Sequence, residues 1–123
     1  MKSHLEGLGH AAINTPVTQN FDPEELISDW SHRHVAFIAG LGKFGLNNML
    51  ITEKGCCGRL GSLITSAYME PDTRKKTENC LYRYNGKCMK CTERCVNEAL
   101  FEKRCDRHKC YEMCLCNEEI FRP

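Results

Sequence analysis

The sequence lacks any long hydrophobic run. No stretch approaches the roughly 20 apolar residues that a membrane-spanning helix needs, and residues 1–7 have no apolar core of the kind found in a signal peptide. Both absences predict a cytoplasmic protein with no membrane partner. In that reducing compartment, thiols serve as metal ligands or catalysts more often than as disulfides.

The chain also lacks a strong charge of one sign. Its formal net charge is +1, which argues against a general nucleic-acid binder. The charge is uneven, however, since residues 74–110 contain eleven Lys or Arg against five Asp or Glu. That excess is either a solvated basic face, a set of cations that offsets negatively charged metal–thiolate clusters, or a patch for nucleic acid or an acidic partner.

Cysteine is the residue that the chain has in excess. Ten of the 123 residues are cysteine, and eight of them follow the spacing C-x7-C-x2-C-x3-C and then C-x4-C-x3-C-x-C: Cys80, Cys88, Cys91, Cys95, Cys105, Cys110, Cys114 and Cys116. The x2-then-x3 spacing is the end of the bacterial ferredoxin run, in which the fourth cysteine ligates the other cluster. Two groups of four thiols predict two [4Fe–4S] clusters, and metal binding would supply much of the folding energy of so short a chain.

Other interpretations of the thiols stay open. Zinc sites favour paired C-x2-C knuckles, and only Cys88 and Cys91 have that spacing, so a zinc-stabilised interaction domain is an alternative. The C-x3-C-x2-C order of radical S-adenosylmethionine enzymes does not occur. Cys56 and Cys57 lie outside the run, in a turn region. Because adjacent thiols are expected to point in different directions, an ordinary structural role is favoured for them over a redox or ligating one.

A helix is predicted over residues 23–30. Asp22 is a good N-cap, Pro23 suits the first helical position, and Glu25 completes a capping box. Further along, residues 49–52 and 60–68 are rich in β-branched and apolar side chains, which predicts two strands joined as a β-hairpin.

Two more helices are expected within the cysteine run. One covers residues 92–100, and the other covers residues 107–119 with Asp106 as its N-cap. Cys110 and Cys114 lie four residues apart in the second helix and would share one face of it.

Residues 40–45 read G-L-G-K-F-G and match the G-x-G-x-x-G fingerprint of dinucleotide-binding folds. Glycines at 55, 58 and 61 interrupt the stretch that should follow, so a turn that lets the backbone approach a ligand or another element is the favoured interpretation. His32 and His34 would share a face on a strand but not on a helix, and a metal-binding pair is the less favoured explanation for them.

Several stretches together resemble a known family. Residues 34–51, which contain A-G-L-G-K-F-G-L-N, the segment G-S-L-I-T at 61–65, and the double cysteine motif resemble the epoxyqueuosine reductases with their double [4Fe–4S] domain. Reductive dehalogenases are similar in the same way. The resemblance covers about residues 32–116. It implies an α+β fold in which residues 1–72 are a truncated nitroreductase-like, corrinoid-domain portion and residues 73–123 are a ferredoxin-like module with two clusters.

The resemblance also implies site residues. By analogy with two-cluster ferredoxins, one cluster would take Cys80, Cys88, Cys91 and Cys116, and the other Cys95, Cys105, Cys110 and Cys114. Gly42, Gly45 and Asn47 match positions that lie near the corrinoid in such reductases. Their proton-donating aspartate lies in a D-T-x-P-like context, where this chain has Asn14, and an amide cannot donate a proton in that role. No catalytic residue is therefore assigned.

These observations together predict an iron–sulfur protein that passes single electrons to a redox partner protein or to a corrinoid such as cobalamin. Whether the chain is itself an enzyme is left open. The alternatives are a corrinoid-dependent reductase, acting alone or with a second chain that supplies the missing half of the corrinoid domain, and the zinc-stabilised domain. An oligomer is compatible with each of them.

Overall fold

The computed structural model describes residues 1–16, 20–74, 76–102 and 104–122. In chain order the elements are α1 (Lys2–Gly7), β1 (Ala12–Asn14), α2 (His32–Ile38), β2 (Lys43–Phe44), β3 (Leu50–Ile51), β4 (Leu63–Thr65), α3 (Leu81–Asn85), α4 (Lys90–Glu93) and α5 (Arg107–Phe121). Helices mixed with a few short antiparallel strands make an α+β chain, as predicted at that coarse level.

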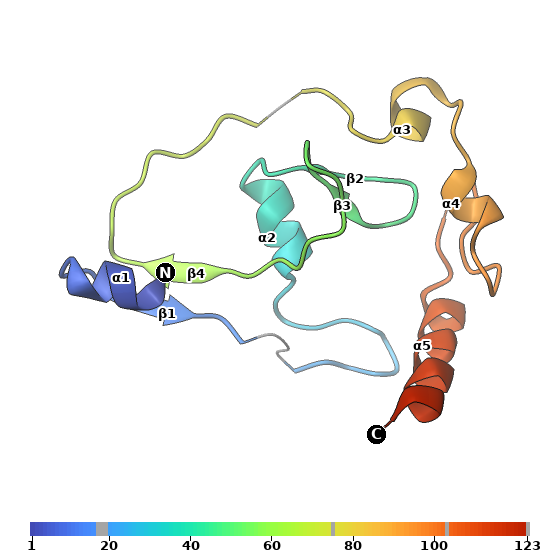
Figure 1. Ribbon diagram of the computed structural model, residues 1–123, viewed down its shortest axis with the longest axis horizontal. Helices are drawn as coiled ribbons and strands as arrows, with labels where there is room; N and C mark the ends of the chain where they lie inside the picture. Colours follow the sequence, from blue (N-terminus) through green and yellow to red (C-terminus); the bar gives the residue numbers. More distant parts are fainter. Residues whose placement is uncertain (17–19, 75, 103, 123) are drawn as a thin grey trace.

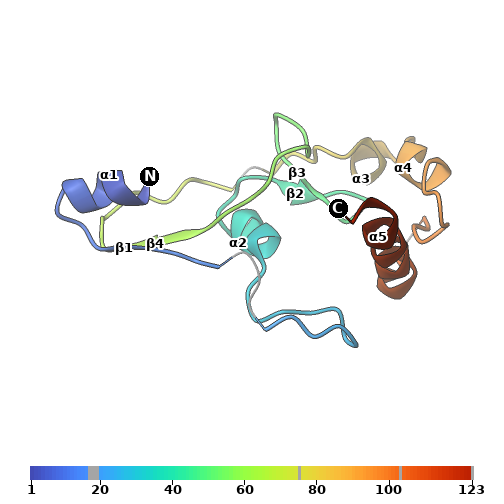
Figure 2. The same cartoon turned by 60° about the horizontal axis from the view of Figure 1, so that its bottom comes forward.

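The elements form three groups that follow one another along an open molecule. Figures 1 and 2 show α1, β1 and β4 at one end, α2 with β2 and β3 in the middle, and α3, α4 and α5 at the other end. The segment after β4 returns along the first two groups to reach α3, and residues 66–74 of it contain no helix or strand. The cysteine-rich helices are thus a separate group that adjoins the middle one.

The predicted hairpin between residues 49–52 and 60–68 is wrong in its pairing. β3 pairs instead with β2, with Lys43 opposite Ile51, and β4 pairs with β1, with Ile13 opposite Ile64. A short turn favours the first pairing, since Gly45 donates its N–H to the carbonyl oxygen of Met49 at 2.9 Å. β4 therefore pairs with a strand about fifty residues earlier in the chain.

The predicted helix over residues 23–30 is also wrong. The capping bonds that the sequence indicated do form, because Asp22 Oδ1 accepts from the backbone N–H groups of Glu24 and Glu25. Leu26 then adopts a left-handed φ of 53°, and Asp22 pairs with Ile27 in an antiparallel bridge. The segment is a tight turn. Asp22 accepts hydrogen bonds in it from the backbone N–H groups that it would also cap at the start of a helix.

The dinucleotide-binding interpretation of residues 40–45 is excluded by the order of the elements. That fold needs a strand before the glycines and a helix after them, whereas here α2 comes before and β2 comes after. Gly40, with φ of 80°, ends α2 in the left-handed conformation that glycine adopts most easily. Gly40 and Gly42 thus lie in the turn from α2 to β2, and Gly45 follows β2.

Few side chains are buried. Among the described residues the buried apolar side chains are Ala12, Leu46, Leu50 and Ala99, and none of them is large and fully enclosed. A folded chain of 14.1 kDa usually exposes about 6,700 Å², but this one exposes 10044 Å². Hydrophobic burial is therefore a weak source of stability for this molecule.

None of the helices that the structure describes has the length and apolar character required to cross a lipid bilayer.

Candidate metal centre

The charges of three other cysteines act on Cys110. Desolvation of its sulfur is the largest cause that raises the pKa of Cys110, followed by the charges of Cys114, Cys105 and Cys95. Burial also raises the pKa of Cys105, ahead of the charge of Cys95.

Three separate segments supply these four thiols. Cys95 follows α4, Cys105 pairs with Leu100 in an antiparallel bridge, and Cys110 and Cys114 belong to α5. The bridge is extended on both sides, since Phe101 donates to the carbonyl of Arg104 and Asp106 donates to that of Ala99. The helix predicted over residues 92–100 is wrong beyond Glu93, where α4 ends. Turns follow, with Glu98 at a left-handed φ of 53°.

The helix predicted over residues 107–119 is confirmed as α5. The side chain of Asp106 accepts a hydrogen bond from the backbone N–H of Lys109 at 3.0 Å, which is the expected N-cap. Cys110 and Cys114 lie four residues apart on α5 and therefore share a face of the helix, as predicted.

Asn97 ties the Cys95 loop to α5, a role that was not predicted from the sequence. Its amide nitrogen donates to the backbone carbonyl of Lys109 at 2.5 Å, and its amide oxygen accepts from the thiol of Cys95 at 3.4 Å. The side chain therefore holds Cys95 beside the first turn of α5. Its position two residues after a candidate ligand was the available signal in the sequence.

Cys80 occupies a different environment at the N-cap of α3. Burial by itself would raise the pKa of this thiol, but the backbone N–H groups of Arg83, Leu46 and Tyr82 and the charge of Arg83 bring it below its ordinary value. Leu46 belongs to the turn between β2 and β3, so Cys80 joins the cysteine segment to the middle group. The environment favours the thiolate, which is the form that binds metals.

The other three cysteines are less closely linked. Cys88 and Cys91 are partly buried on either side of the start of α4, and Cys116 is exposed on α5. Across the ranges that the structure describes, no set of three His, Cys, Asp or Glu side chains has the geometry to hold a single metal ion. The set of Cys80, Cys88, Cys91 and Cys116 stays a prediction.

A cavity of about 230 Å³ lies between the cysteine segment and the β2–β3 turn. Its walls combine Cys105 with three arginines and with the turn itself: Arg83, Arg104, Arg107, Phe44, Gly45, Leu46 and Asn48. The charges of Arg107 and Arg33 lower the pKa of Cys105, opposing the burial that raises it. Part of the basic excess in the sequence is thus concentrated beside a candidate ligand.

Gly42 and Gly45 allow the β2–β3 hairpin to pack closely on itself. A Cβ atom at Gly42 would lie 2.5 Å from the carbonyl oxygen of Ile51, and one at Gly45 would lie 2.5 Å from the Ile51 side chain. Asn47 caps the turn by accepting from the backbone N–H of Met49 at 3.2 Å. These contacts within the chain account for the three residues that the resemblance associates with a corrinoid, whose binding stays a prediction.

The two histidines in the pattern H-x-H lie on α2 and do not form a pair. His32 contacts the Ser62 hydroxyl at 2.8 Å and the Pro16 carbonyl at 3.1 Å through its two ring nitrogens. His34 contacts Ser31 and packs against Phe44 at 5.0 Å between ring centroids. Both side chains have structural roles.

No protein-family model, curated protein or solved structure was found to match this chain.

Proposed function

We propose that the chain is an iron–sulfur electron-transfer protein whose eight clustered cysteines, within residues 80–116, hold two [4Fe–4S] clusters. The observation that carries this proposal is the contact made by Asn97, which hydrogen-bonds both the Cys95 thiol and the backbone of α5, the helix that carries Cys110 and Cys114. The charges of Cys114, Cys105 and Cys95 also raise the pKa of Cys110, after desolvation of its sulfur. These four thiols come from three segments of the chain. They coincide with one of the two ligand sets that the analogy with two-cluster ferredoxins implies.

The chemistry of this donor set suits an iron–sulfur cluster. All four groups are thiols, the ligands that such clusters require. Asn97 supports the arrangement by fixing Cys95 against α5.

The second ligand set would be Cys80, Cys88, Cys91 and Cys116. Cys80 is favoured as a thiolate by three backbone N–H groups, which oppose the effect of burial on its pKa. Cys116 lies two residues after Cys114 on α5 and so faces another side of the helix. It is therefore suited to a different cluster from the one that Cys110 and Cys114 would hold.

The surrounding residues would adjust the electronic properties of the site. When bound, the clusters would accept and release single electrons. Arg83, Arg104 and Arg107 place positive charge beside Cys105 and would offset the negative charge of a thiolate-ligated cube. The backbone N–H of Leu46 at Cys80 is a hydrogen bond to sulfur, one of the means by which proteins raise a cluster potential.

Anaerobic reconstitution of the full chain tests the proposal. Two clusters require about eight iron and eight sulfide per chain, and the reduced protein should give the electron paramagnetic resonance signal of [4Fe–4S]⁺. Fewer than about one cluster per chain after reconstitution would overturn the proposal. Stoichiometric zinc without sulfide would favour the zinc-stabilised domain instead.

A corrinoid-dependent reductase is the second candidate function, acting alone or with a second chain. It is favoured by the cavity that Gly45 and Cys105 share, because the turn that resembles the corrinoid side of epoxyqueuosine reductases is a neighbour of a proposed cluster ligand. On this interpretation residues 1–72 are a nitroreductase-like fragment and residues 73–123 a ferredoxin-like module. Cobalamin added to the protein should show a shifted absorption spectrum, and no shift at high micromolar concentration would remove this candidate.

A further inference from the structure

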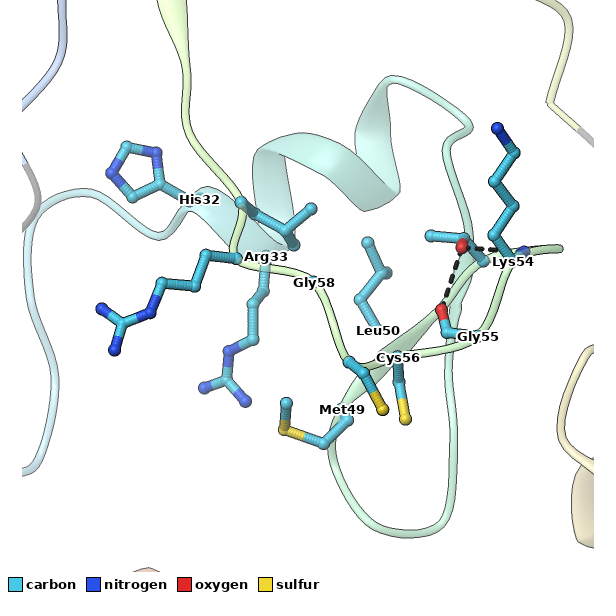
Figure 3. Close-up of a pocket in the computed structure, with 12 residues that line it drawn as sticks. His32, Arg33, Met49, Leu50, Lys54, Gly55, Cys56 and Gly58 are labelled. Atoms are coloured by element: carbon cyan, nitrogen blue, oxygen red, sulfur yellow. Dashed lines mark hydrogen bonds between the residues drawn. The ribbon is translucent and has the colours of Figure 1, made fainter.

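A second group of sulfur-containing side chains lies outside the cysteine-rich segment. A pocket of about 550 Å³ beside β3 and the turn after it is lined by Met49, Cys56 and Cys57, together with the basic residues Arg33, Lys54 and Arg59. Figure 3 shows the sulfur atoms of the pocket gathered at one end of it, where Cys56 and Met49 are labelled.

A rigid turn positions the two cysteines. Thr52 and Gly55 exchange two backbone hydrogen bonds of 3.0 Å, and the Thr52 hydroxyl donates to the Gly55 carbonyl at 2.9 Å. Gly55 has φ of 99°, a conformation that side-chain-bearing residues avoid. Both cysteines follow this turn at once and line the same pocket, although adjacent thiols were expected to point apart.

We propose that Cys56, Cys57 and Met49 form a binding site for a soft metal ion, Cu(I). Thiolate and thioether ligands together select Cu(I) over harder ions, and Cu(I) is stable with a small set of sulfur ligands. Two thiolates are too few for an iron–sulfur cube. Zinc would need further nitrogen or thiolate ligands, and both ring nitrogens of the nearby His32 already contact Ser62 and Pro16.

The charges and the accessibility of the pocket fit this ion. Binding forms two Cu–S bonds to thiolates and releases the two thiol protons, so the occupied site carries one negative charge. Arg33 and Arg59 in the pocket wall offset that charge. Cys57 is exposed, Cys56 is partly buried and Met49 is 40% exposed, so a donor can deliver the ion directly.

Alkylation of a single tryptic peptide reports on this site. Trypsin cleaves after Lys54 and Arg59, which releases a peptide of residues 55–59 that contains Cys56 and Cys57 and no other cysteine. The full-length, cluster-loaded protein is treated anaerobically with one equivalent of Cu(I) from a buffered complex and is then alkylated. We expect Cu(I) to lower the alkylation of this peptide about tenfold, because an ion bound at most of the sites blocks both thiols.

Three variants identify the ligands through competition with a chromogenic Cu(I) chelator. Cys56→Ser with Cys57→Ser should weaken Cu(I) binding at this site at least about a hundredfold, and Met49→Leu, which preserves volume, about tenfold. Met69→Leu is the matched control, because Met69 is exposed and does not line the pocket, and it should bind like the wild type.

The proposal is overturned if the 55–59 peptide is alkylated equally with and without Cu(I), or if copper protects only peptides from residues 80–116. It is also overturned if the Met49→Leu and Met69→Leu proteins bind Cu(I) alike. Unchanged iron content and far-ultraviolet circular dichroism in the double cysteine variant separate loss of the site from loss of the fold. Alkylation of the 55–59 peptide is read separately from that of peptides from residues 80–116, so failure of this site is distinguished from failure of the cluster proposal.

Discussion

The two parts of this chain are held together by different means. Residues 1–72 contain every strand that pairs with another in the described structure, together with the buried Ala12, Leu46 and Leu50. Residues 73–123 contain the longest described helix and eight cysteines, but only Ala99 is buried there among the described residues. We therefore expect the stability of the second part to depend on the clusters proposed for its thiols.

Removing the metal should have the largest effect on the difference in stability between the two parts. Treatment of the reconstituted protein with an iron chelator should cause the backbone amides of α5 to lose their protection, because the proposed cluster would link Cys110 and Cys114 of this helix to Cys95 and Cys105 of the preceding loop. Amides of β2 and β3 should keep theirs. Hydrogen–deuterium exchange read by mass spectrometry measures both, and equal loss in the two parts would contradict the proposed division.

Removing one pair of thiols should have the next largest effect. Cys110→Ser with Cys114→Ser takes away two ligands of one proposed cluster, so the chain should lose about half of its iron and sulfide. Cys56→Ser with Cys57→Ser is the matched control and should keep the iron content of the wild type. Iron and sulfide analysis after reconstitution distinguishes them, and equal iron in both variants would argue against Cys110 and Cys114 as ligands.

The same substitution in the two parts should give unequal losses of stability. Leu50 is 4% exposed in β3, so Leu50→Ala should lower the free energy of unfolding by about 2–5 kcal/mol. Leu115 on α5 is 43% exposed, and Leu115→Ala should cost less than about 1 kcal/mol. Urea denaturation of the two variants measures the difference, and a larger loss for Leu115 would show that α5 has a hidden apolar interface.

Gly42→Ala should destabilise the hairpin of the first part by about 1–3 kcal/mol. The added Cβ would meet the backbone carbonyl of Ile51, which cannot rotate away as a side chain could. Gly58→Ala is the control, because nothing lies within 4 Å of its missing Cβ, and it should change stability by less than about 0.5 kcal/mol. If both variants melt at the same temperature, the close approach at Gly42 is not important for stability.

The smallest expected effect concerns the N-cap of α5. Asp106→Ala removes the acceptor for the Lys109 N–H and should cost about 1 kcal/mol. Asp106→Asn keeps an acceptor oxygen and should retain most of that stability. Thermal unfolding followed by circular dichroism compares the two, and an Asn variant as unstable as the Ala variant would indicate that the charge of Asp106 matters more than its cap.

Local signals predicted structure correctly where nothing distant competed with them. Asp106 was predicted to cap a helix, and it begins α5. Asp22 carried an equally good signal, but the bonds it accepts are made as readily by a turn as by a helix, and the Asp22–Ile27 bridge favoured the turn. A strong cap therefore identifies satisfied donors and does not determine whether a helix or a turn comes after it.

Strand pairing could not be predicted in the same way. Residues 63–65 were recognised as extended, yet their partner is β1, from a segment with little pattern in the sequence. The candidate metal centre shows the same limit, because the spacing identified candidate cysteines but did not predict the contact between Asn97 and Lys109 or the Leu100–Cys105 bridge. Contacts between distant residues depend on which competing pairing closes with the least loss of chain entropy.

The sequence alone determined the chemistry of this protein: a cysteine-rich, basic carboxy-terminal part, a capped helix carrying two thiols on one face, and glycines where the backbone turns. Residue type and short-range spacing are enough for these features, since each depends on neighbours within one helical turn or one tight loop. The tertiary structure decided that Cys95 and Cys105 join Cys110 and Cys114, and that Met49 joins Cys56 and Cys57 in one pocket. These contacts require particular bridges and turns between separated segments. The free energies of those bridges and turns depend on several parts of the chain at once, so no single stretch predicts them.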